Sequence, residues 1–168
     1  MDTLRWSEVE EKFKHVADRL GRPIDDGIFK TVVALNVLGI STYMSCEGHL
    51  DHGLPYPWVA IGTQAEETLE EKEQQERSRL LLHQMVFGHL ADFYSTRHVS
   101  YDRIITSKQI GRGIRIYSQG GDFLELVSLD LTERLSKLHE YQDEMNAFTE
   151  FLRAAYNKEY DGIGFLDR

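Results

Sequence analysis

Apolar positions along the chain follow helical spacing in some stretches and strand-like composition in others. Ser7 and Glu10 form a capping-box pair, which predicts the start of a first helix. Gly21 and Pro23 are expected to end it. Its apolar positions are Val9, Phe13, Val16 and Leu20. A second helix is predicted from Asp26 to Leu38, after the acidic pair Asp25 and Asp26 and before Gly39, with apolar positions Ile28, Val32, Leu35 and Leu38.

Short β-rich runs follow. Residues 40–44 (ISTYM) and 57–62 (PWVAIG) predict two strands joined by a loop. Residues 101–109 and 113–121 flank the glycine-bearing turn IGRG at 110–113, which predicts a hairpin.

The second half of the chain is mainly helical in pattern. Residues 64–79 are so polar that we interpret them as a solvated helical extension or a mobile insertion. Residues 80–94 predict a packed helix with a face of Leu81, Met85, Leu90 and Phe93 or Tyr94. A long amphipathic helix is predicted at the end of the chain, with a stripe of Leu131, Leu135, Leu138, Met145, Phe148, Leu152 and Tyr156. The preceding segment FLELVSL fits a strand or the first turns of that helix.

This order of elements predicts an α+β fold, in which amphipathic helices pack on a small, largely antiparallel sheet of about four strands as a two-layer sandwich. At 168 residues the chain suits a single domain over 1–168, able to bury about two thirds of its unfolded surface. One cysteine allows no internal disulfide, and no apolar run resembles a signal peptide or a membrane span, so we expect a cytoplasmic protein with no membrane partner. The net charge of −9 disfavours binding to nucleic acid.

Candidate chemistry is concentrated in residues 43–59, YMSCEGHLDHGLPYPWV. Cys46, Glu47 and His49 are the candidate catalytic residues, with Cys46 as a nucleophile or with Glu47 and His49 in acid–base roles. Packing of Cys46 as a small apolar side chain is the alternative. His49, Asp51 and His52 are candidate ligands for a divalent metal such as zinc, although their spacing matches no standard signature and solvated loop residues are the alternative.

The same loop contains residues suited to a small ligand. Gly48 and Gly53 allow positive φ or a close approach of the backbone to a ligand, and Ser45 is a further candidate contact. Tyr56 and Trp58 share one strand face, where they are suited to flank a planar ligand. Core packing is the alternative for Trp58. The predicted hairpin adds three candidate anion contacts, Arg103, Arg112 and Arg115, for which solvated surface positions are the alternative.

The run from Gly39 to Val59 also brings a resemblance into view. Thr42, Ser45, Cys46, Glu47 and Gly48, followed by Pro55, Pro57 and Val59, resemble a Thr-x-x-Ser-Cys-Glu-Gly loop and Pro-x-Pro-x-Val strand in small bacterial proteins of uncharacterised activity. A fainter resemblance is to the tRNA wybutosine-synthesising methyltransferase family, in which a strand ends in Ser-Cys-Ser-Gly-Arg. Here Glu47 replaces the second serine and His49 the arginine. These resemblances imply a local helix–strand–loop–strand layout over about residues 30–62 rather than an activity.

Three functions are consistent with these patterns. The first is a small-ligand-binding protein for a nucleotide-like or other anionic metabolite, which uses the 45–58 loop. The second is a small hydrolase or transferase in which Cys46, Glu47 and His49 are catalytic or bind metal. The third is a protein-interaction module that acts through the acidic 66–79 segment and the last helix, which leaves a homodimer open.

Overall fold

The structure is a computed structural model, and it describes residues 6–62, 69–111, 113–118 and 123–163. Its elements in chain order are α1 (Trp6–Lys14), α2 (Asp26–Val37), β1 (Thr42–Cys46), β2 (Trp58–Ile61), α3 (Leu69–Thr96), the short 3-10 helix η1 (Tyr101–Arg103), β3 (Ile105–Ile110), β4 (Gly113–Ser118), α4 (Phe123–Ser128) and α5 (Leu131–Ile163). None of the helices in these ranges is long and apolar enough to cross a bilayer.

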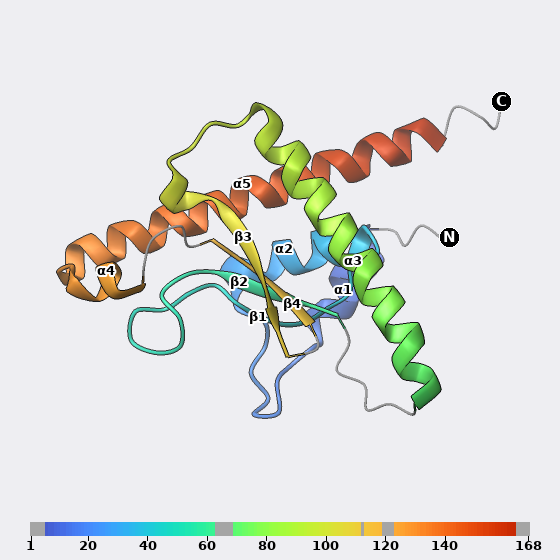
Figure 1. Ribbon diagram of the computed structural model, residues 1–168, viewed down its shortest axis with the longest axis horizontal. Coiled ribbons are helices and arrows are strands. Elements are labelled where there is room, and N and C mark those ends of the chain that lie inside the picture. Colours follow the sequence, from blue (N-terminus) through green and yellow to red (C-terminus); the bar gives the residue numbers. More distant parts are fainter. Residues whose placement is uncertain (1–5, 63–68, 112, 119–122, 164–168) are drawn as a thin grey trace.

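The four strands form one antiparallel sheet in the order β1-β2-β4-β3. α2 and α5 pack against one face of this sheet, and α3 crosses α5 (Figure 1). The predicted α+β class with a four-stranded antiparallel sheet is confirmed. Among the described strands β1 is an edge strand that pairs with β2 alone, and residues of the segment between α1 and α2 lie across a cavity from it.

The main core lies between the sheet and the helices. It contains Val59, Ile61, Ile105 and Ile116 from the strands, and the helical side chains Ile28, Leu35, Val86, Phe93, Met145, Phe148 and Leu152. A smaller cluster on the opposite sheet face joins Trp58 and Ala60 to Tyr56, Leu126 and Tyr141. Alternate residues of β2 therefore belong to two different clusters, because successive side chains of a strand point to opposite faces of the sheet.

α2 and the turn after it follow the sequence closely. The Gly39 N–H donates to the Asn36 carbonyl at 3.0 Å and the Ile40 N–H to the Leu35 carbonyl at 2.9 Å. This is a Schellman ending, and Gly39 adopts the left-handed φ of 77° that it needs. The predicted glycine stop is confirmed, and it delivers the chain into β1.

The first helix is shorter than predicted. α1 ends at Lys14, and Val16 and Leu20 are 40% and 76% exposed rather than part of a buried face. Beyond it, the Asp18 carboxylate accepts the N–H groups of Leu20 and Arg22 at 2.8 and 2.9 Å. Asp side chains that bind nearby backbone compete with a helix, so the chain turns here instead.

The later helices also refine the predictions. α3 is one continuous helix, so residues 69–79 form the predicted helical extension. Its buried face differs from the prediction, because Leu81 is 53% exposed and Val86 is buried instead. FLELVSL contains the separate helix α4, because Asp130 and Glu133 form a reciprocal capping box that starts a new helix. Leu131 and Leu135 are consequently exposed on the first turns of α5, while the rest of the predicted stripe is buried.

Candidate metal and ligand site

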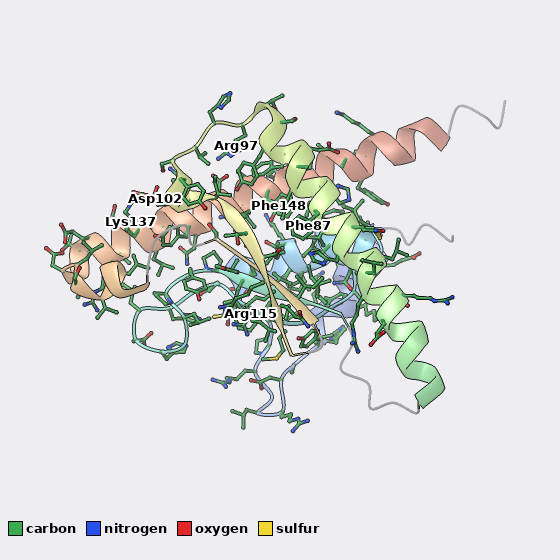
Figure 2. The ribbon with its side chains drawn as sticks, in the orientation of Figure 1. Phe87, Arg97, Asp102, Arg115, Lys137 and Phe148 are labelled. Carbon is green, nitrogen blue, oxygen red and sulfur yellow. The ribbon has the colours of Figure 1, made fainter. Side chains whose placement is uncertain are left out.

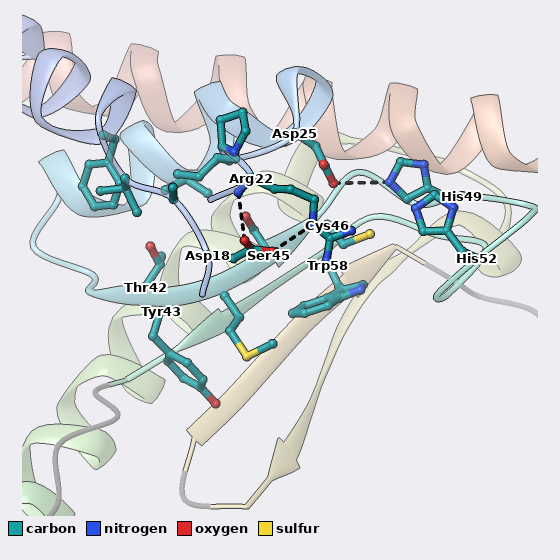
Figure 3. Close-up of a pocket in the computed structure, with 17 residues that line it drawn as sticks. Asp18, Arg22, Asp25, Thr42, Tyr43, Ser45, Cys46, His49, His52 and Trp58 are labelled. Carbon is teal, nitrogen blue, oxygen red and sulfur yellow. Dashed lines mark hydrogen bonds and ion pairs between the residues drawn. The ribbon is translucent and has the colours of Figure 1, made fainter. Parts of the chain in front are cut away.

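A cavity of about 340 Å³ lies between the edge strand β1 and the segment from Val16 to Asp25. Figure 3 shows Asp25, Cys46, His49 and His52 near one another at one end of this cavity, and the hydrogen-bonded pair Asp18 and Arg22 further along its wall. Apolar residues, among them Phe13, form much of the remaining wall.

Three side chains from separate segments converge at that polar end. A carboxylate oxygen of Asp25, the Sγ of Cys46 and a ring nitrogen of His49 lie within 4.8 Å of one another. His49 Nε2 is 3.4 Å from Asp25 Oδ2 (Figure 3). A thiol, an imidazole and a carboxylate at this separation are a donor set that zinc accepts.

Each of these side chains is positioned by local backbone structure. Asp25 directly precedes α2, and its Oδ2 accepts the Glu47 N–H at 3.1 Å. Cys46 ends β1 and is paired across the strands with Trp58. The His49 N–H donates to the Leu54 carbonyl at 3.0 Å, which closes the loop between β1 and β2.

Gly48 gives this loop its tight path. It has a φ of 88°, and a Cβ there would lie 2.7 Å from the Tyr56 carbonyl carbon. Only glycine fits both constraints, because other residues are strained at positive φ and any side chain would overlap the backbone of Tyr56, where the loop returns toward β2. Gly48 therefore fixes the distance between Cys46 and His49 rather than contacting the cavity.

The Cys46 thiol is half-buried and is not activated by a cation. Burial raises its pKa, and the nearby Asp25 carboxylate raises the pKa further, while the Gly48 N–H, 3.4 Å from the sulfur, acts in the opposite direction. A thiol with a raised pKa holds its proton at neutral pH, which makes it a weak nucleophile unless a metal displaces the proton.

The predicted metal set of His49, Asp51 and His52 is also brought together, with ligand atoms within 4.8 Å. The His52 ring stacks on His49 at 4.1 Å between centroids, and His52 Nδ1 lies 2.8 Å from the Asp51 carboxylate. That contact lowers the pKa of Asp51. Asp51 and His52 are exposed, whereas Asp25, Cys46 and His49 are each partly buried. The two sets share His49.

Glu47 lies beside the site, with its carboxylate directed to α2. Glu47 Oε2 accepts the Gly27 N–H at 2.7 Å, and its backbone carbonyl accepts the Gln142 side-chain N–H at 3.1 Å. These contacts tie the loop to both α2 and α5. The contact with Gly27 occupies the carboxylate that the sequence suggested as catalytic.

The predicted ligand-binding residues fall in different places. Ser45 and Trp58 line the cavity, but Tyr56 is buried in the smaller cluster against Tyr117. Arg103 points to α5, where its Nη2 is 3.9 Å from Glu144 and 3.4 Å from the Glu140 carbonyl. Arg115 stacks on Trp58, with 3.9 Å between the guanidinium carbon and the ring centroid. Arg112 lies outside the described residues.

Asp25 is the site residue that sequence reasoning missed. In the sequence it belongs to the acidic start of a helix, and it lies 21 positions before Cys46 in the chain. The only available signal is its place just before a helix that leads through a glycine into the cysteine-bearing strand. Only the packing of α2 beside β1 shows that its carboxylate reaches the sulfur.

No protein-family model matches the chain, and no curated protein or solved structure matches it significantly. The two resemblances of the 39–59 segment therefore stay predictions. The site has to be interpreted from its own geometry.

Proposed function

We propose that this protein binds an anionic small molecule through a divalent metal ion, of the zinc type, held by Asp25, Cys46 and His49. The observation that carries the proposal is the convergence of three different ligand atoms, within 4.8 Å, at the wall of a 340 Å³ cavity. Sites for small molecules commonly have volumes of about 300–1,000 Å³, so the cavity is at the small end of that range.

The donor set favours a soft or borderline metal. Thiolate and imidazole ligands suit zinc, whereas magnesium and calcium prefer oxygen alone. Three protein ligands also leave one tetrahedral position for water or an incoming anion. Apolar cavity residues such as Phe13 and Trp58 would then contact the rest of the ligand.

Surrounding contacts support the same assignment. The Glu47 N–H holds the Asp25 carboxylate, and the Gly48 N–H lies against the Cys46 sulfur. Hydrogen bonds of this kind orient metal ligands and stabilise negative charge on them. The His52 ring, stacked on His49, restricts the orientation of the imidazole.

Competition of the purified protein with a chromogenic chelator for Zn²⁺ tests the proposal. Cys46→Ala and His49→Ala should each weaken zinc binding by more than the about 10–100-fold that loss of an outer partner costs. His52→Ala is the matched control, because it removes an adjacent histidine and should weaken binding less. If His52→Ala and His49→Ala abolish binding while Cys46→Ala does not, the ion belongs to His49, Asp51 and His52 and the assignment is wrong.

Metal-assisted hydrolysis is a second candidate, favoured by the open fourth position beside the cavity. A zinc-bound water loses its proton near neutral pH and becomes a nucleophile. Zinc-loaded protein would then hydrolyse an activated ester or phosphoester such as a p-nitrophenyl compound, and His49→Ala would not. If the protein binds zinc but hydrolyses none of these compounds, hydrolysis is ruled out for them and the ligand-binding proposal stands.

A further inference from the structure

Two cations face each other on the sheet face opposite the main core. Lys108 of β3 and Arg115 of β4 are direct partners in the antiparallel register, so their side chains project to the same face. Arg115 is also the partner of Ala60, which places it beside Trp58. Met44, the partner of Ala60 on β1, is 49% exposed, so this part of the face is open to solvent.

Each cation lies over an aromatic ring of the same face. The Arg115 guanidinium carbon is 3.9 Å from the centroid of Trp58, and Lys108 Nζ is 5.2 Å from the centroid of Tyr117. The rings hold the charged groups close to the sheet by cation–π attraction. They contribute no negative charge and accept no strong hydrogen bond from the cations.

In the part of the chain that the structure describes, no carboxylate pairs with either of these two cations. Among the described residues, neither Lys108 nor Arg115 has a hydrogen-bond or ion-pair partner, and the buried Arg115 Nε has no acceptor. In contrast, Arg97 binds Glu144 at 2.7 Å, and Lys137 binds Asp102 at 2.7 Å, where Figure 2 shows the two labelled side chains close together. Like charges directly opposite on a sheet repel each other. Two adjacent cations without an acidic partner are therefore unexpected in a chain of net charge −9.

We propose that Lys108 and Arg115 bind the phosphate group of a small molecule. The arginine fork donates two parallel hydrogen bonds to phosphate oxygens, and the lysine adds a compact charge from the neighbouring strand. The site differs from the metal site in residues and chemistry. Trp58 connects the two, because it carries Arg115 and also lines the cavity.

Titration with inorganic phosphate at constant ionic strength, followed by calorimetry, tests this site. Lys108→Gln and Arg115→Gln should each weaken binding at least tenfold. Arg153→Gln is the matched control, because Arg153 is likewise a cation over a tryptophan, 5.2 Å from the centroid of Trp6, and its removal should leave binding unchanged. Lys108 is exposed, so its variant keeps the test valid even if Arg115→Gln fails to fold.

Trp6→Phe leaves Trp58 as the only tryptophan, and its fluorescence should then change with the same saturation curve. The titration uses protein freed of metal with a chelator, so that saturable phosphate binding cannot come from an ion held by Asp25, Cys46 and His49. Absence of saturable binding, or equal binding by Lys108→Gln, would overturn the proposal and leave the metal site unaffected.

Discussion

Glu47 and Gly27 form the clearest pairwise contact near the site. The Glu47 carboxylate accepts the Gly27 N–H in the first turn of α2, and a Cβ at position 27 would lie only 2.5 Å from that carboxylate oxygen. The close approach of the two groups therefore explains why glycine occupies a helical position. It also assigns Glu47 a role in holding the loop against α2.

A double-mutant cycle tests this contact. Glu47→Ala should lower the free energy of unfolding by about 1–2 kcal/mol, because a helix N-terminal N–H loses its acceptor. Gly27→Ala should destabilise the unsubstituted chain, and it should cost clearly less in the Glu47→Ala background, because the carboxylate oxygen 2.5 Å from the new Cβ is gone and only the Cβ of residue 47, at 3.3 Å, remains in contact. Urea unfolding measures all four proteins. An equal cost of Gly27→Ala in both backgrounds would contradict the packing described.

The Cys46 thiol gives a pH-dependent prediction. Burial first, and then the Asp25 carboxylate, raises its pKa in the folded chain. Alkylation by iodoacetamide should therefore reach half its maximal rate at a higher pH in the metal-free folded protein than in urea. Asp25→Asn should move that midpoint toward the unfolded value without reaching it, because burial remains.

The same shift affects stability. The unfolded chain releases the thiol proton at a lower pH than the folded chain, so this contribution to stability is present below the ordinary thiol pKa and is lost as the pH rises above it. A folded-state alkylation midpoint at or below that in urea would contradict the environment assigned to Cys46.

Helices α3 and α5 are joined through one fully buried carboxylate. Glu144 accepts Arg97 Nε and Nη2 at 3.0 and 2.7 Å and the Tyr94 hydroxyl at 3.1 Å. The Tyr94 hydroxyl in turn accepts the Ile105 N–H at 2.8 Å at the start of β3. The hydrogen bond from Arg97 to Glu144 raises the pKa of Arg97. This network fixes the crossing of the two helices over the sheet.

Arg97→Ala should therefore destabilise the fold by about 3 kcal/mol, because it leaves the buried Glu144 carboxylate without its main partner. Lys14→Ala is a suitable control, since it removes only an exposed ion pair with Glu11, which water and salt screen. Thermal and urea unfolding give both values. Equal costs for the two substitutions would show that Glu144 is not buried as described.

The elements were predictable where their signals are local. Gly39 ends α2 and the glycines of residues 110–113 mark the hairpin, and both signals hold in the structure. The apolar spacing placed the end of α1 too late, because Val16 and Leu20 fit a helical face while the nearby Asp18 carboxylate binds the N–H groups of Leu20 and Arg22 and turns the chain. In the site, Cys46 and His49 were predictable because many reactive residue types lie close together in the loop. The contribution of Asp25 was not, because it depends on how α2 packs beside β1, which no local pattern contains.

At the scale of the whole molecule, metal binding should be linked to folding. At a free Zn²⁺ concentration about 100 times Kd, binding adds about 2.7 kcal/mol, which raises Tm by about 5–11 °C for a chain of this length. Mg²⁺ should produce a much smaller shift, since it prefers oxygen ligands. Cys46→Ala should lose most of the zinc-dependent shift, and an equal shift in this variant would place the ion elsewhere.

The expected cytoplasmic location and the interaction module of residues 66–79 and the last helix stay predictions. A homodimer would use surface apolar groups rather than the buried stripe of α5, and Leu131 and Leu135 on its first turns are exposed. Sedimentation of the purified chain would decide between a monomer and a dimer.

The proposed function depends on one metal ion bound by the chain's only cysteine together with Asp25 and His49. The absorption spectrum of the protein with one equivalent of Co²⁺ tests it most directly, because a thiolate–cobalt charge-transfer band can arise only from Cys46. We expect that band in the near ultraviolet together with intense visible bands of tetrahedral cobalt, and we expect His52→Ala to keep them. A spectrum like that of cobalt in water would contradict it.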